Sequence, residues 1–218
     1  FTKPLEKSDQ GNISRASMAD VYLQVETDLK QAIDYLPQKS EYAAEDMGRA
    51  TSGAARAYLA RVIMYQLGCD NSNDHSWEEV YAHTDTIISS GEYTLASNFA
   101  EIFEIEGENG AGSIFEIQCA ENPAGEDWGG IMGGSFANVF QGNREYWGWG
   151  FNNPTEDLIE EFNEKDPRLP CTVYKEGDVV YGVEQAWYSA SETPYLNRKA
   201  ALDPALRPAG DGKDGPAN

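Results

Sequence analysis

Apolar side chains recur at helical spacing near the start of the chain. The first run extends from Met18 to Leu36 and stops at Pro37, a residue that cannot continue a helix. Ser17 and Asp20 stand at the spacing of a capping box, in which a hydroxyl and an acidic side chain three positions later bind free backbone N–H groups. The pattern therefore predicts a helix that begins directly after Ser17.

Two further helices are predicted downstream. Thr51 has the chemistry of an N-cap for an alanine-rich helix that ends near Gly68. Ser76 and Glu79 form a second capping-box pattern, ahead of an amphipathic segment that begins with a tryptophan and stops at Gly91. A helix of small residues followed by a helix headed by tryptophan resembles a tetratricopeptide hairpin, a repeat of about 34 residues.

The second half of the chain has only short patterned segments. Residues 113–119 predict a strand, and Thr155 predicts the start of a short helix in which Leu158, Ile159 and Phe162 face inward. Residues 172–174 and 179–181 predict the two strands of a hairpin. The chain is therefore expected to change from a helical to a loop-rich architecture after about one hundred residues.

The charge of the chain excludes some partners. Its 218 residues include 16 Lys and Arg against 37 Asp and Glu, which gives a formal net charge of −21. Nucleic acid is not expected as a partner, because binding to phosphates needs clustered basic residues. No apolar run approaches the roughly 20 residues of a membrane span. The excess of acidic residues is interpreted as a solvated surface that keeps the protein soluble. The alternative is an acidic face that recruits cations.

Several short motifs stand in a fixed order along the chain and together resemble one family. They are Ser14–Ser17, Gly48–Thr51, Ile114–Gln118, Pro154–Leu158, Asp166–Leu169 and Arg198–Lys199. In this order they resemble the signatures of the SusD/RagB family, the nutrient-binding outer-membrane lipoproteins of Bacteroidetes-type bacteria. The resemblance covers nearly the whole chain, which is expected to be about half of a family member.

The resemblance implies a fold and a division of the chain. The expected fold is mostly α, with tetratricopeptide-like helical hairpins, inserted loops and short β-strands, and it is SusD-like but incomplete. Residues 1–100 are expected to form the helical scaffold. Residues 101–218 are expected to form a loop-rich ligand-binding insertion with short strands and one short helix. The helices that carry a lipidated cysteine, and those that complete the scaffold, are expected to lie outside this sequence.

The resemblance also implies a function. Family members bind nutrient oligomers, most often glycans, on the extracellular face of the outer membrane. They pass the ligand to a SusC-like TonB-dependent transporter without any chemistry, and a lipid anchor outside the present sequence would hold them to the membrane. Two alternatives stay open. One is a peptide-binding RagB-like member, and the other is a surface glycosidase, which needs two carboxyl groups about 5–9.5 Å apart across a cleft.

A glycine-rich segment over residues 122–153 is the predicted ligand-binding region. It carries three of the five tryptophans, together with amides and an arginine. Flat rings can stack on the C–H faces of pyranoses, and amide or guanidinium groups can bind their hydroxyls. The predicted contacts are Trp128, Asn143, Arg144, Tyr146 and Trp147. The alternative is that the aromatic residues of this segment form a small core beneath the loop, which is the interpretation favoured for Trp149.

The sequence contains no recognisable catalytic or cofactor motif. Its two histidines, His75 and His83, are too far apart for a zinc-protease helix, and no nucleophile elbow or phosphate-binding lysine follows the glycines. Residues 70–74 vaguely resemble a calcium loop but lack its glycine and its final glutamate. The three cysteines have no zinc spacing. The sequence therefore predicts a binding protein that has no metal, no cofactor and no enzymatic activity.

Overall fold

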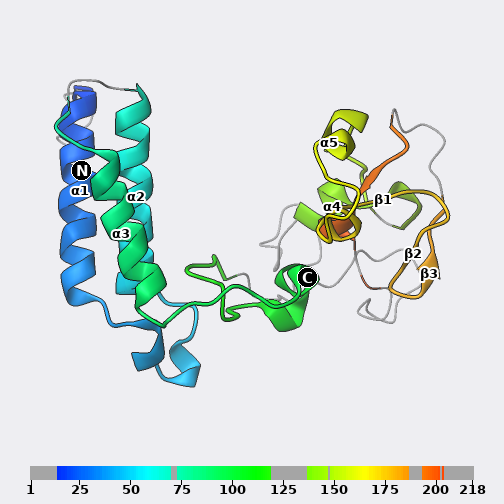
Figure 1. Ribbon diagram of the computed structural model, residues 1–218, viewed down its shortest axis with the longest axis horizontal. Helices are drawn as coiled ribbons and strands as arrows, with labels where there is room; N and C mark the ends of the chain where they lie inside the picture. Colours follow the sequence, from blue (N-terminus) through cyan, green and yellow to red (C-terminus); the bar gives the residue numbers. More distant parts are fainter. Residues whose placement is uncertain are drawn as a thin grey trace, which may run out of the picture. The chain divides into compact units, whose positions relative to one another are not determined.

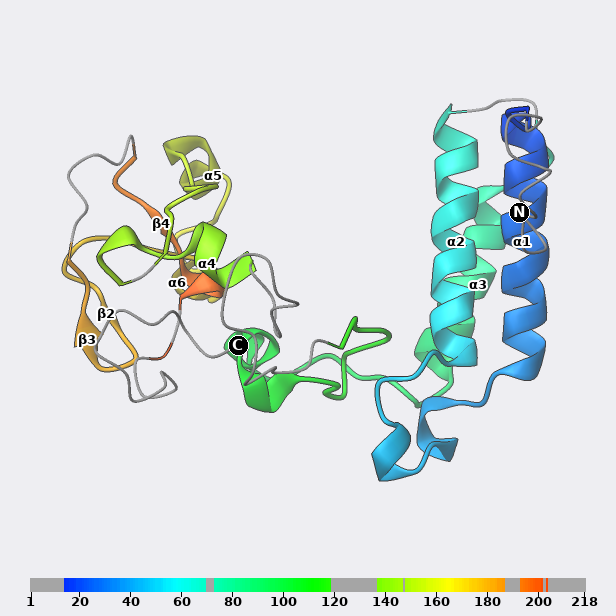
Figure 2. The same ribbon diagram turned by 180° about the vertical axis from the view of Figure 1, so that it is seen from behind.

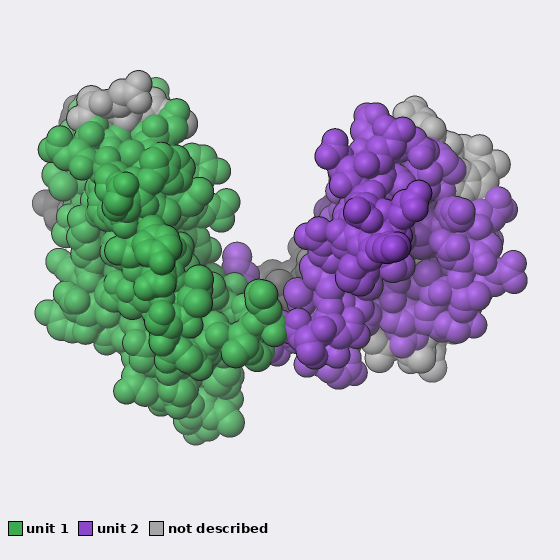
Figure 3. Space-filling model, in the orientation of Figure 1, with its two compact units in different colours: residues 1–95, 111–116 green, residues 96–110, 117–218 purple. Residues whose placement is uncertain are grey.

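The computed structural model (Figure 1) describes residues 14–69, 73–118, 137–146, 148–186, 193–201 and 203. The chain divides into two units, which Figure 3 shows in different colours. Unit 1 comprises Phe1–Leu95 and Ala111–Glu116, and unit 2 comprises Ala96–Gly110 and Ile117–Asn218. No helix formed by the described residues has the length and apolar character needed for a membrane crossing.

Unit 1 is built from the three helices that the sequence predicts. They are α1 (Met18–Tyr35), α2 (Ser52–Cys69) and α3 (Trp77–Ser89). Figures 1 and 2 show them side by side, and α2 packs against both α1 and α3. Two short 3₁₀ turns, η2 (Lys39–Glu41) and η3 (Ala44–Asp46), lie in the connection between α1 and α2.

Side-chain caps fix where these helices begin. The Ser17 hydroxyl accepts a hydrogen bond from the N–H of Asp20, at 3.1 Å, and the Thr51 hydroxyl accepts one from the N–H of Ala54, at 3.0 Å. The Ser76 hydroxyl caps α3 through the N–H of Glu79, at 3.3 Å. The second half of this capping box does not form, because the Glu79 carboxylate bonds to His75 instead.

The core of unit 1 lies on the faces of α2. Leu59 and Ile63 are fully buried, and Ala60 and Val80 complete the cluster. Burying a side chain such as Leu or Ile contributes about 1.5–3 kcal/mol. At the start of α2, a Cβ on Gly53 would lie only 2.5 Å from the Tyr93 hydroxyl, so a larger residue there would displace the tyrosine ring. Glycine at position 53 therefore allows Tyr93 to pack closely against the start of α2.

The predicted strand over residues 113–119 is wrong for the part that is described. Residues 113–118 are irregular, and no described strand pairs with them. A strand needs a partner strand to satisfy its backbone groups, and none of the described strands supplies one here. The Lys39 ammonium donates to the carbonyl of Ser113, at 3.0 Å, and the Phe115 ring packs edge-on against Tyr58.

Unit 2 is assembled from short elements joined by ordered turns. The helical elements are η4 (Phe99–Phe103), η5 (Ile105–Gly107), α4 (Ala137–Gln141), η6 (Arg144–Tyr146), α5 (Glu156–Glu160), α6 (Leu169–Thr172) and η7 (Arg198–Ala200). The strands are β1 (Val173–Tyr174), β2 (Val179–Val180), β3 (Val183–Glu184) and β4 (Leu196–Asn197).

The strands pair differently from the predicted hairpin. β1 pairs antiparallel with β4, and β2 pairs antiparallel with β3. The reason lies at Tyr181 and Gly182, which both have positive φ (50° and 74°). Two such residues form the tight turn whose twist suits a two-residue hairpin, so β2 pairs with β3 across this turn and not with β1.

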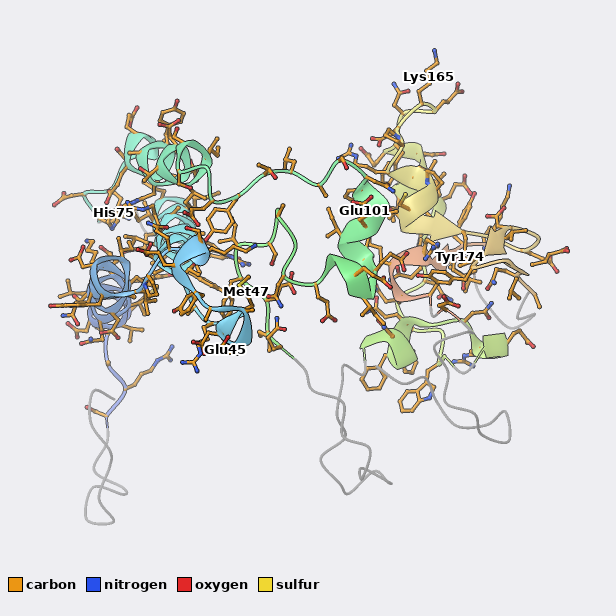
Figure 4. All side chains as sticks on the ribbon, turned by 90° about the horizontal axis from the view of Figure 1, so that it is seen from below. Glu45, Met47, His75, Glu101, Lys165 and Tyr174 are labelled. Atoms are coloured by element: carbon orange, nitrogen blue, oxygen red, sulfur yellow. The ribbon has the colours of Figure 1, made fainter. Side chains whose placement is uncertain are left out.

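Side chains from these strands form the core of unit 2. Tyr174, which is labelled in Figure 4, is buried together with Val180 and Leu196. α5 begins at Glu156 as predicted. Ile159 and Phe162 are half-buried, but Leu158 does not face inward, since it is 39% exposed.

A polar cluster attaches the η4–η5 segment to this core. The Tyr181 hydroxyl donates to a carboxylate oxygen of Glu104, at 2.8 Å, and the Arg198 guanidinium donates to the same hydroxyl, at 3.1 Å. Burial raises the pKa of Tyr181, which keeps this hydroxyl protonated.

Candidate ligand-binding surface

A close crossing of the backbone positions the predicted ligand-binding segment. A Cβ on Gly148 would lie 1.9 Å from the carbonyl atoms of Gly142, far inside any allowed contact. The N–H of Gly148 donates to the carbonyl of Asn143, and the N–H of Gly150 donates to that of Gly142, both at 2.9 Å. Glycine is required at this crossing because the two chain segments touch through their backbones.

Asn143 holds this loop from within. Asn143 is buried, with only 4% of the residue exposed. The amide Nδ2 donates to the carbonyl of Ala186, at 3.1 Å, and Oδ1 accepts from the N–H of Glu145, at 3.0 Å. In this arrangement the Asn143 amide supports the loop that carries the neighbouring candidate residues and does not face solvent.

Arg144 lies on the outside of the same loop. It is exposed, and its Nε donates to the carbonyl of Trp149, at 2.6 Å. The aliphatic part of the side chain lies over Gly150, where a Cβ would come within 3.1 Å of Arg144 Cγ. Gly150 also has positive φ, at 66°. The guanidinium is thus held at the surface by a backbone carbonyl and a glycine.

The remaining predicted contacts lie outside the part of the chain that the structure describes in full. Trp128 and Trp147 fall on undescribed residues, and only the backbone of Tyr146 is described, within η6. Their contact with a ligand stays a prediction.

An aromatic cluster around Trp149 lies beside Arg144, and the sequence alone does not single out its two phenylalanines. The Trp149 ring meets Phe140 edge to face (centroids 4.9 Å apart, 66°) and Phe151 at nearly a right angle (6.1 Å, 87°). Trp149 is half-buried, whereas Phe140 and Phe151 are 39% and 53% exposed. The two phenylalanines are brought together by a backbone hydrogen bond from the N–H of Phe151 to the carbonyl of Phe140, at 2.8 Å.

Three amides connect the same segments. Gln141 Oε1 accepts hydrogen bonds from Asn152 Nδ2, at 2.9 Å, and from Asn197 Nδ2, at 2.7 Å. Asn152 has positive φ, at 56°, a conformation that asparagine tolerates better than most residues. Sequence reasoning could find the abundance of amides here, but not that three of them form one connected group.

A network of ionisable side chains in unit 1 has a structural role. His75 bridges the carboxylates of Glu26, at 3.0 Å, and Glu79, at 2.8 Å (Figure 4 labels His75). Burial opposes the charged forms. The hydrogen bonds within the network outweigh this effect of burial. The pKa of Glu26 therefore falls to about 2, and the pKa of His75 is raised. Glu26 also accepts from Gln66 and Lys30. This network connects α1 and α2 to the start of α3.

The described residues contain no arrangement that would hold a metal. No group of three or more His, Cys, Asp or Glu side chains among them is placed to bind an ion. The described side chains around Arg144 offer a hydrogen-bonding guanidinium and aromatic rings.

Comparisons with known proteins identify relatives of this chain. A family profile for SusD-like proteins, described as "Starch-binding associating with outer membrane", matches residues 2–64. A SusD-like protein P25 from Formosa agariphila is 28% identical over 142 residues, which cover 64% of this chain and 25% of the relative. A SusD-like protein from Bacteroides ovatus is 28% identical over 110 residues, 49% of this chain and 19% of the relative.

Solved structures share the fold. A SusD-like carbohydrate-binding protein from Bacteroides fragilis has a TM-score of 0.73 at 24% identity, over 97% of this chain and 45% of that one. Surface glycan-binding protein A from Bacteroides thetaiotaomicron, solved with laminarihexaose, has a TM-score of 0.68 at 21% identity. The match covers 92% of this chain and 46% of that one. The chain thus spans less than half the length of these relatives. The prediction of a mostly helical, SusD-like fold with short strands is confirmed.

Proposed function

Because this chain is a member of the SusD/RagB family of SusD-like proteins, we propose that it binds a glycan without transforming it. The binding surface is the part of unit 2 that surrounds residues 137–152. The observation that carries this proposal is the loop held by the Gly142–Gly148 crossing, which keeps Arg144 and two phenylalanine rings exposed at one surface. Relatives of the same fold have been solved with oligosaccharides, which supports a sugar as the ligand class.

The chemistry of this surface suits a sugar. Pyranose rings present polarised C–H groups on their faces, and an aromatic ring has a negative face that attracts them. Their hydroxyls need hydrogen-bond donors in fixed positions, and the Arg144 guanidinium is fixed by its bond to Trp149. We assign stacking to Trp128, Tyr146 and Trp147, hydrogen bonding to Arg144, and support of the loop to Asn143.

The cellular role is proposed from the family. The ligand would be captured on the extracellular face of the outer membrane by a lipid-anchored protein and passed to a SusC-like TonB-dependent transporter. The family profile is described as associating with the outer membrane, which supports this location. No chemistry on the ligand is required for such delivery.

A titration of the whole chain tests the proposal. Laminarihexaose and maltohexaose would be titrated into the protein by calorimetry, beside a mixture of peptides of matched length. We expect saturable binding of an oligosaccharide, weaker binding in R144A, and no shorter sugars by chromatography after prolonged incubation. Tight binding of peptides without any response to sugars would favour the RagB-like alternative. Release of shorter sugars would identify a glycosidase.

A further inference from the structure

The exposed rings beside Arg144 are held in fixed orientations. Trp149 contacts Phe140 and Phe151 through edges, so each phenylalanine is restrained on one side and open to solvent on another. Edge-to-face ring contacts of this kind stabilise the rings beyond the area that they bury. Because the rings are already ordered, little side-chain entropy is lost when a ligand stacks on them.

The neighbouring side-chain amides are also held in fixed orientations by hydrogen bonds. Gln141 Oε1 receives two hydrogen bonds, from Asn152 and Asn197, which orients both the Gln141 and the Asn152 amide. Within the described part of the chain, Gln141 Nε2 and Asn152 Oδ1 take part in no hydrogen bond. Among the described residues, one donor and one acceptor are thus left available in set positions.

The backbone places the rings next to the amides. Phe140 and Gln141 are consecutive, as are Phe151 and Asn152, and the bond from the N–H of Phe151 to the carbonyl of Phe140 brings the two pairs together. The left-handed conformation of Asn152 (φ 56°) is part of this arrangement. Such conformations cost energy and occur often at ligand sites.

The chemistry of these four side chains selects one class of ligand. Each is uncharged, two are flat and apolar, and two are amides. The whole chain carries a net charge of −21, which disfavours an anionic ligand. A neutral sugar unit fits, because it offers a C–H face for a ring and hydroxyls that both donate and accept.

We propose that Phe140, Gln141, Phe151 and Asn152 form a subsite for one neutral sugar unit of the bound oligosaccharide. The subsite rests on the proposed glycan-binding function and extends the ligand surface beyond Arg144. Stacking is assigned to the rings of Phe151 and Phe140. Gln141 Nε2 donates to one sugar hydroxyl, and Asn152 Oδ1 accepts from another.

Two variants test the subsite without disturbing the fold. N152G removes the amide and keeps the left-handed backbone, which glycine adopts freely, and Gln141 Oε1 still accepts from Asn197. F151L keeps an apolar side chain but removes the flat ring, whereas F151Y keeps the ring. We expect the Kd for laminarihexaose or maltohexaose to rise about 3- to 10-fold in N152G and in F151L, and to stay close to the wild-type value in F151Y.

Matched controls are available elsewhere in the chain. Asn109 is also in the left-handed conformation (φ 53°) with its amide bonded to Gln118, so N109G repeats the same change at another site. F115L repeats the ring change in unit 1. Both controls should bind like the wild type. Unchanged binding in N152G and F151L, while R144A loses affinity, would overturn the subsite alone. A wild-type protein that binds neither oligosaccharide would overturn the proposed function and the subsite with it.

Discussion

Replacing Gly148 by alanine is expected to open the crossing that supports the ligand surface. The added Cβ would lie 1.9 Å from the carbonyl carbon and oxygen of Gly142 and 2.4 Å from its Cα. Carbon atoms in contact normally lie about 3.5–4.0 Å apart, so the two segments must separate by roughly 1.6–2.1 Å. Backbone atoms cannot move away by changing rotamer, so the whole loop has to shift.

The energetic cost comes from the bonds that the shift breaks. The hydrogen bonds from Gly148 to Asn143 and from Gly150 to Gly142 are both 2.9 Å long and would be stretched beyond bonding distance. Each is worth about 0.5–1.5 kcal/mol, and overpacking of a tight contact costs about 1–3 kcal/mol. We therefore expect G148A to destabilise unit 2 by about 2–6 kcal/mol.

Hydrogen exchange read by mass spectrometry measures this effect locally. Amides of residues 148–151 should exchange much faster in G148A, and those of α1–α3 should not change. G68A is the matched control, because a Cβ on Gly68 meets no atom within 4 Å and alanine favours a helix by about 0.8–1 kcal/mol. Unaltered protection of residues 148–151 in G148A would refute the importance of the crossing.

Three further changes test the account. L59A removes a fully buried side chain from the core of unit 1 and should lower its free energy of unfolding by about 2–5 kcal/mol, measured by urea denaturation. The pKa of His75 is raised by the carboxylates of Glu26 and Glu79, so its stabilisation is fully present below pH about 6.5 and is lost as the pH rises through the native pKa. The difference in unfolding free energy between the wild type and H75N should therefore be larger at pH about 5.5 than at pH about 9, and a difference that grows with pH would contradict the assignment. G182A places a side chain at a φ of 74° and should destabilise the β2–β3 hairpin by about 1–2 kcal/mol, seen as faster exchange of its amides.

The helices of unit 1 were predictable because their signals are local. Ser17, Thr51 and Ser76 each provide a cap at the N-terminus of a helix, and apolar periodicity defines the helix behind each cap. In unit 2 the sequence predicted the positions of β1 and β2, but neither their pairing nor the strands β3 and β4. β1 and β4 each have two residues, and their pairing joins segments more than twenty residues apart. Such a pairing is determined by tertiary contacts and not by the sequence of the strands themselves.

The ligand surface was predictable in composition but not in detail. The richness of the segment in rings and amides is visible in the sequence, and it led to Arg144. The pairing of Phe140 with Phe151 depends on a backbone crossing between two glycines, which no local pattern reveals. Asn143 has the residue type of a ligand contact, but only its burial shows that its amide is used within the loop.

The most direct test of glycan capture by unit 2 is a map of backbone amide shifts by NMR during addition of laminarihexaose or maltohexaose. The account predicts saturable shifts that are concentrated at residues 140–152, with α1, α2 and α3 unaffected and with the sugar recovered intact. Shifts confined to the helices of unit 1, or no shifts with any oligosaccharide, would contradict it.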